Sequence, residues 1–192
     1  GAFGEVGAVK GLIFRELEKM VTTKLGLRAW DTLVERAPLT TRDGFIGSVT
    51  YPDADLFALV RAASELTGRP ESELLYAFGR FIFPDLVHMY GGLLAGTGTA
   101  KEFLLSVERV VHVEVAKLHT GAVLPEFDYE DPAPDRLVVL YRSRRRLCDF
   151  AAGLIDAVGD HFGEDIAQVH RLCTRQGAEH CRFELTFSAR AD

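Results

Sequence analysis

Apolar residues recur every three or four positions through most of the first two thirds of the chain, the spacing of helices with one buried face. We expect five helices, over residues 9–25, 28–36, 56–66, 70–84 and 101–118. Gly26 and Gly68 stand where the first and third of these helices would end, and Asp53 stands where a side chain would cap the third. Pro84 is expected to kink or break the fourth helix, because proline removes a backbone donor.

The pattern changes after Gly121. Consecutive apolar residues predict a buried strand, and alternating aromatic and aliphatic residues around a glycine turn predict a hairpin. The expected elements are a strand at 136–141, a helix at 146–158 and a hairpin of 169–173 with 181–187. The expected loops are 40–51, a flexible 91–98, and the stretch marked by Pro125, Pro132 and Pro134. The predicted class is α+β: an N-terminal helical lobe, then a helix with a small antiparallel sheet.

Composition places the chain among ordinary globular proteins. Of its 192 residues 47% are hydrophobic, so we expect a single domain over 9–187, with 1–8 an expression remnant or a flexible start. The net charge of −6 argues against a nucleic-acid binder, and no apolar run reaches the ~20 residues of a membrane span. Three cysteines cannot all pair within one chain, which favours a reducing, cytoplasmic compartment.

The common catalytic motifs are missing from the sequence. It contains no phosphate loop, no G-x-S-x-G elbow and no H-E-x-x-H. His88, His119 and His161 lie beside charged or loop residues and are expected to be solvated or satisfied. The residues therefore do not favour an enzyme.

His112 lies on or beside the apolar face of the helix predicted at 101–118. By itself it is either a core histidine or a metal ligand, since neutral imidazole commonly binds metals. Alternation would place Tyr141, Ser143 and Arg145 on one face at the end of the predicted strand. All three donate hydrogen bonds, so together they could bind a carboxylate. The alternative is a solvated basic edge, because the flanking residues are also arginines.

All three cysteines fall in the C-terminal part of the chain, near a histidine. Thiolate and imidazole ligands of this number suit tetrahedral zinc, and the chain offers them at Cys148, His170, Cys173 and Cys181. The alternative is that the three cysteines are simply buried as apolar side chains. His170 and Cys173 would point to opposite faces of a regular strand, so a zinc site needs a turn or bulge there. His180 is the competing fourth ligand.

Four features in register resemble one family. They are the opening Lys10–Phe14, His112, Pro125 and the Tyr-x-Ser-x-Arg motif that starts 29 residues after His112. The chain resembles the haem nitric oxide/oxygen binding (H-NOX) family over about 9–187. The resemblance implies haem b between a distal lobe (about 9–68) and a proximal lobe (about 69–187), with His112 as the proximal iron ligand. It also implies that Tyr141, Ser143 and Arg145 hold the propionates and that Pro125 presses on the porphyrin. The implied distal lining is Ile13, Leu17, Ile82, Leu86, Phe150 and Leu154.

The resemblance also implies a sensor of nitric oxide. Oxygen-binding members are similar in carrying a distal tyrosine nine residues beyond the first tyrosine of the motif, where this chain has Phe150. Phenylalanine donates no hydrogen bond, so we expect NO and CO to bind and oxygen to be excluded. Release of His112 and a helix shift would then signal to a partner, such as a histidine kinase or a cyclic-di-GMP enzyme.

A subset of the family resembles this chain in having a Cys3His zinc site near the C-terminus. The resemblance therefore implies zinc at Cys148, His170, Cys173 and Cys181, with a possible redox input through the thiolates. The alternative function is a haem-free module of the same fold that binds a lipid or another apolar ligand. A zinc hydrolase is disfavoured, because four protein ligands leave no position for water.

Overall fold

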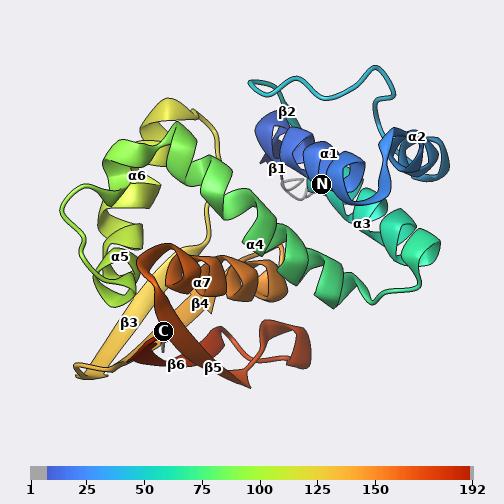
Figure 1. The fold of residues 1–192 in the computed structure, drawn as a ribbon. Coiled ribbons are helices and arrows are strands. Elements are labelled where there is room, and N and C mark those ends of the chain that lie inside the picture. Colours follow the sequence, from blue (N-terminus) through green and yellow to red (C-terminus); the bar gives the residue numbers. More distant parts are fainter. Residues whose placement is uncertain (1–7, 191–192) are drawn as a thin grey trace, which may run out of the picture.

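A computed structural model describes residues 8–190, and the expectation for 1–7 lies outside the described residues. Figure 1 shows a helical lobe, a lobe that contains a sheet, and a long helix between them. In chain order the elements are β1 (Ala8–Lys10), α1 (Gly11–Leu25), α2 (Leu27–Arg36), β2 (Thr50–Pro52), α3 (Asp53–Thr67), α4 (Glu71–Met89), α5 (Ala100–Ser106), α6 (His112–Leu118), β3 (Glu126–Ala133), β4 (Arg136–Arg142), α7 (Cys148–Phe162), β5 (Glu164–Leu172) and β6 (Cys181–Ala189). The predicted α+β class is confirmed.

The N-terminal lobe is built from α1, α2, α3 and a two-stranded ribbon of β1 and β2. Phe14 of α1 stacks on Phe45 at a ring distance of 4.2 Å, so the loop before β2 lies against α1. The prediction that Asp53 caps α3 was wrong. Pro52 occupies the cap position, and Asp53 begins the first helical turn, where a carboxylate still suits the positive helix end.

Of the kink or break predicted at Pro84, the structure excludes the break. Helix α4 continues through Pro84 to Met89, because extensive packing against α7 outweighs one lost backbone hydrogen bond. The two helices cross at glycines. A Cβ at Gly79 would lie 2.2 Å from the Phe150 carbonyl oxygen, and one at Gly153 would lie 2.0 Å from the Tyr76 carbonyl oxygen. Only glycine allows backbones to approach this closely.

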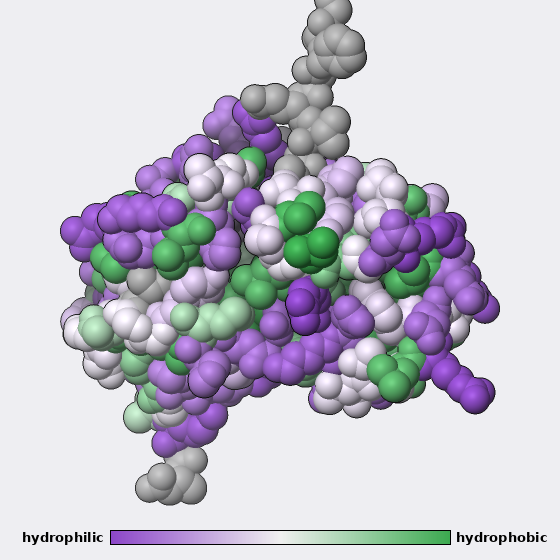
Figure 2. Space-filling model, turned by 90° about the horizontal axis from the view of Figure 1, so that it is seen from above, coloured by the Kyte–Doolittle hydropathy of each residue, from purple (hydrophilic) through white to green (hydrophobic). Residues whose placement is uncertain are grey.

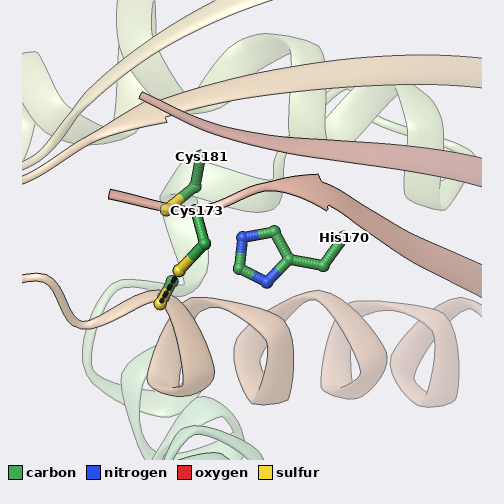
Figure 3. Close-up of side chains that lie close together, drawn as sticks. His170, Cys173 and Cys181 are labelled. Atoms are coloured by element: carbon green, nitrogen blue, oxygen red, sulfur yellow. Dashed lines mark hydrogen bonds between the residues drawn. The ribbon is translucent and has the colours of Figure 1, made fainter. Parts of the chain in front are cut away.

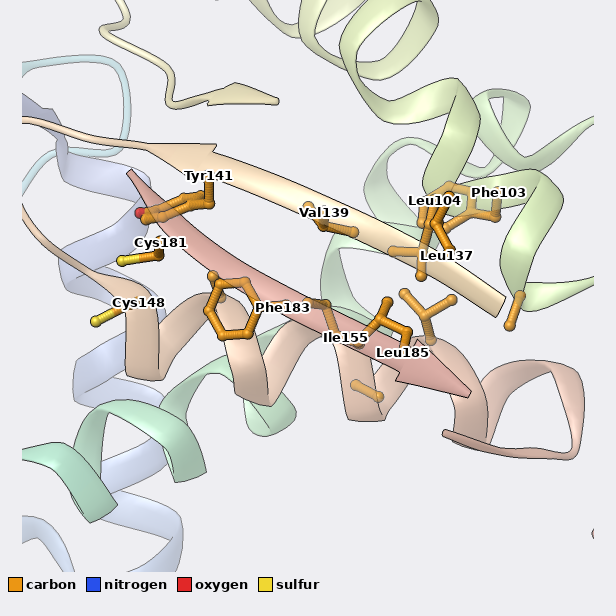
Figure 4. Packing of buried hydrophobic residues seen from close by; sticks show 14 of the residues in the cluster. Phe103, Leu104, Leu137, Val139, Tyr141, Cys148, Ile155, Cys181, Phe183 and Leu185 are labelled. Atoms are coloured by element: carbon orange, nitrogen blue, oxygen red, sulfur yellow. The ribbon is translucent and has the colours of Figure 1, made fainter. Parts of the chain in front are cut away.

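The C-terminal lobe contains an antiparallel sheet of strand order β3-β4-β6-β5. Helix α7 covers one face, and Figure 4 shows Val139, Phe183 and Leu185 in the layer between the two. The proline-marked segment predicted as a loop is largely strand β3. It lies at the sheet edge, where proline is tolerated, and its register shifts between Glu130 and Ala133.

The helix predicted over 101–118 is interrupted by one wider turn. Helix α5 is followed by a π-helical segment, Val107–Val111, and α6 then begins at His112. Such π turns are rare in proteins as a whole, but those that occur often lie at functional sites. The segment predicted as a flexible loop at 91–98 begins with a short 3₁₀ helix, Gly91–Leu94.

Helix α4 contributes to both cores. Phe78 and Ile82 pack with the N-terminal core, whereas Phe83 packs with the core between the sheet and α7. The lobe boundary expected near residue 68 therefore stays a prediction, with α4 shared between the lobes. Figure 2 shows one mostly hydrophilic face with scattered apolar side chains. In the part of the chain that the structure describes, no helix is long and apolar enough to cross a membrane.

Candidate functional site

A largely apolar cavity of about 330 Å³ lies between the two cores. Its walls include six of the residues singled out for a prosthetic group, namely His112, Pro125, Tyr141, Ser143, Arg145 and Phe150. Ile13, Leu86 and Leu154 also line it. Leu17 and Ile82 do not belong to the cavity lining. The resemblance implied that both line the distal pocket, but both are buried in the N-terminal core. Core positions and cavity-lining positions are alike apolar, so residue type does not distinguish them.

His112 reaches the cavity from the first residue of α6. Its side chain is 15% exposed, and its Nδ1 lies 3.1 Å from Oε2 of Glu108. The ring lies 5.2 Å from the ring of Phe127. Burial lowers the pKa of His112, and the Glu108 carboxylate partly opposes this effect. Because Glu108 occupies the Nδ1 side, Nε2 is the ring nitrogen available to a metal.

Tyr141, Ser143 and Arg145 line the cavity together. Tyr141 ends the buried part of β4, and burial raises its pKa to about 12. The chain leaves the strand after Arg142, and a turn then brings Arg145 to the cavity, where its backbone N–H donates to Ser143 Oγ at 3.2 Å. The Arg145 guanidinium donates to the Val123 carbonyl at 2.7 Å, and burial lowers its pKa.

The sequence analysis missed several polar residues of the cavity. Tyr90 and His119 both line it and hydrogen-bond to each other, so His119 is satisfied as expected. They stand 29 positions apart, and no local pattern connects them. Glu108 does not line the cavity but contacts His112, and it could have been found, since residues four apart on a helix are neighbours.

The cavity fits a large apolar group that carries a metal and carboxylates. One imidazole nitrogen is available to the metal, the walls are mostly hydrocarbon, and a phenol, a hydroxyl and a guanidinium stand together as carboxylate donors. Haem has this chemistry.

A second cluster lies at one end of the C-terminal core. The ligand atoms of Cys148, His170, Cys173 and Cys181 all lie within 4.8 Å of one another. Figure 3 shows the His170 ring pointing toward the cysteines. The register shifts between His170 and Leu172, which supplies the bulge that a shared site requires. This grouping contains His170 and not His180.

The spacing of the cluster suits tetrahedral zinc. Zinc–sulfur bonds of about 2.3 Å place two sulfurs roughly 3.8 Å apart. Cys148 Sγ and Cys173 Sγ are 3.7 Å apart. Burial, together with the nearby Cys181, raises the pKa of Cys148 to about 12. Burial also acts to raise the pKa of Cys173, but hydrogen bonds from the backbone and side chain of Arg175 bring it below its ordinary value.

Comparisons with known proteins agree with this geometry. The crystal structure of an H-NOX protein from S. oneidensis in the Fe(II)NO state is 28% identical, with a TM-score of 0.87, and the match covers 94% of this chain and 99% of that one. The Fe(II) unliganded H-NOX protein from K. algicida is 27% identical, with a TM-score of 0.89 and coverage of 96% and 99%. An NMR structure of the S. oneidensis domain in the Fe(II)CO state is 28% identical, with a TM-score of 0.85 and coverage of 94% and 99%.

The family model described as Haem-NO-binding matches residues 10–170. The match includes His112, Pro125 and the Tyr141–Arg145 set and ends before Cys173 and Cys181. The chain belongs to the Haem-NO-binding, or H-NOX, family of haem domains.

Proposed function

We propose that this domain is a haem-based sensor of nitric oxide that binds NO and CO and excludes oxygen. The observation that carries the proposal is the apolar cavity between the two cores, with the His112 imidazole in its wall. When bound, haem b would supply an iron that can bind a protein ligand and a diatomic gas.

His112 would hold the iron through Nε2, and Tyr141, Ser143 and Arg145 would hold the propionates. Pro125 lines the same cavity and would press on the porphyrin. The donor types present and the match to the family over residues 10–170 support these roles.

Gas selectivity rests on Phe150. It lines the cavity with Ile13, Leu86 and Leu154, and these four side chains also pack against the N-terminal core. They are hydrocarbon and donate no hydrogen bond. Bound oxygen gains from a nearby donor, whereas NO and CO need much less help, so this wall favours NO and CO.

Signalling would start at His112. It is the first residue of α6 and directly follows the π turn, so its release would free α6 to shift. The domain would act on a partner, such as a histidine kinase or a cyclic-di-GMP enzyme, in the cytoplasm, and would catalyse no reaction itself.

We also propose zinc at Cys148, His170, Cys173 and Cys181. The ligand types and the 3.7 Å sulfur separation support a closed structural site. An external two-electron oxidant such as a peroxide would join two of the thiolates in a disulfide and release the zinc, which would give the domain a redox input.

The proposal is tested by the absorbance of haem-replete protein, reduced and then exposed to NO, CO or air. We expect a Soret band that shifts with NO and CO and not with air. His112→Ala should lose the haem or alter the ferrous spectrum, whereas His88→Ala, an exposed histidine on α4, should change neither. Absence of a Soret band would overturn the proposal of a haem sensor and favour the module that binds an apolar ligand. Native mass spectrometry would then identify that ligand.

A further inference from the structure

Glu108 connects the proposed iron ligand to the sheet. Its Oε2 lies 3.1 Å from Nδ1 of His112 and accepts the backbone N–H of Phe127 at 3.0 Å. Phe127 belongs to β3 and pairs with Tyr141 of β4. One carboxylate oxygen of Glu108 therefore contacts both the His112 ring on α6 and the backbone of β3.

The surroundings keep this carboxylate in place. Glu108 lies in the π turn, one helical turn before His112, and the backbone of β3 holds it from the other side. The Phe127 ring packs 5.2 Å from the imidazole and 5.4 Å from the ring of Tyr141. The position of Glu108 is thus set by the strand as well as by its own helix.

We propose that Glu108 is a positioning residue that sets the strength of the bond between His112 and the haem iron. The inference rests on the proposed haem function. With Nε2 on the metal, the proton of the ring lies on Nδ1 and is donated to Glu108. A carboxylate partner fixes the ring orientation and makes the other nitrogen a stronger donor to the metal.

This role has a direct consequence for sensing. A stronger bond to His112 resists release, so Glu108 opposes the step that would free α6. Glu108 would therefore limit how completely NO binding releases His112. The carboxylate would keep the Phe127 N–H as a partner after that release.

The test compares Glu108→Gln with wild type by resonance Raman spectroscopy of the reduced haem protein. Glutamine keeps the shape and an oxygen that can accept the Phe127 N–H, but it removes the charge. We expect the iron–histidine stretching band to move to lower frequency and the five-coordinate share of the NO complex to rise. The matched control is Glu114→Gln on α6, the helix of His112, where the partly exposed carboxylate contacts Lys117 at 2.7 Å.

The outcomes separate this inference from the proposed function. A wild-type protein without a Soret band overturns both. If wild type shows a Soret band and the iron–histidine stretching frequency is the same in wild type, Glu108→Gln and Glu114→Gln, the role of Glu108 alone is overturned. If Glu108→Gln does not hold haem, ring ¹⁵N NMR of haem-free wild type decides the matter: a proton on Nε2 of His112 instead of Nδ1 overturns the role.

Discussion

Asp53 Oδ2 and Arg145 Nε lie 3.8 Å apart and join the two lobes at the cavity. Asp53 begins α3 of the N-terminal lobe, and Arg145 follows β4 of the C-terminal lobe. The side chains are 23% and 13% exposed, so solvent screens the pair only in part. A guanidinium proposed to hold a propionate is therefore also held by the opposite lobe.

Asp53→Asn should lower the free energy of unfolding by about 1 kcal/mol, because it leaves the largely buried Arg145 charge with weaker compensation. Urea denaturation measures the loss. Glu65→Gln, an exposed carboxylate on the same helix, is the control. Equal losses in the two variants would mean that the pair contributes nothing specific.

Gly153→Ala should destabilise the domain by about 1–3 kcal/mol, since its Cβ would lie 2.0 Å from the Tyr76 carbonyl oxygen and push α4 away from α7. Thermal unfolding checks this. A Cβ at Gly92 would meet open space, so Gly92→Ala should keep the wild-type midpoint. A wild-type midpoint for Gly153→Ala would show that the crossing can relax without cost.

Tyr141 should make the fold sensitive to alkali. Its pKa is raised from 10.0 to about 12, so the folded state retains a proton that the unfolded state loses. This contribution is fully present below pH 10 and is lost as the pH rises through 12, an effect on the order of 2 kcal/mol. Denaturation between pH 9 and 12 should show a steeper decline for wild type than for Tyr141→Phe; parallel declines would contradict the prediction.

Phe150→Tyr should let the reduced haem protein bind oxygen, because it places a hydroxyl donor in the cavity wall. Absorbance spectra before and after admission of air measure the change. Phe150→Leu alters the same position without adding a donor and should stay insensitive to air. Oxygen binding by the leucine variant would mean that selectivity lies elsewhere.

Metal analysis of purified protein should find one zinc per chain. His170→Ala should weaken zinc binding by more than roughly tenfold, as expected for a lost ligand, whereas His180→Ala should keep it. Competition with a colorimetric chelator gives both affinities. Equal weakening in the two variants would reopen the choice between the histidines, and absence of zinc from wild type would reject the site.

Much of the fold was predictable because its signals are local. Gly26 and Gly68 end α1 and α3, and the apolar run over Leu137–Leu140 forms β4. Strand β3 escaped prediction because acidic residues and Pro132 fill it, and an edge strand tolerates them when its partner supplies the pairing. The sequence could not exclude a break at Pro84, because packing of α4 on α7 is a tertiary effect.

Part of the candidate site was likewise predictable from the sequence, and part was not. Motif spacing singled out His112 and the Tyr141–Arg145 set, and the structure brings them to one cavity. Tyr90 and His119 meet only through the fold. The distal lining implied by the resemblance placed Leu17 and Ile82, which fill a core, beside Ile13 and Leu86, which border the cavity. Residue type alone does not separate such apolar positions.

The sharing of α4 has a consequence for how the molecule opens. Its residues Phe78 and Ile82 belong to one core and Phe83 to the other, so opening of one core leaves this helix held by the other. The amide protons in the middle of α4 should therefore exchange with solvent only when the whole domain unfolds. A motion that carries the proposed signal would then leave the middle of α4 intact. The two lobes would rotate about this helix.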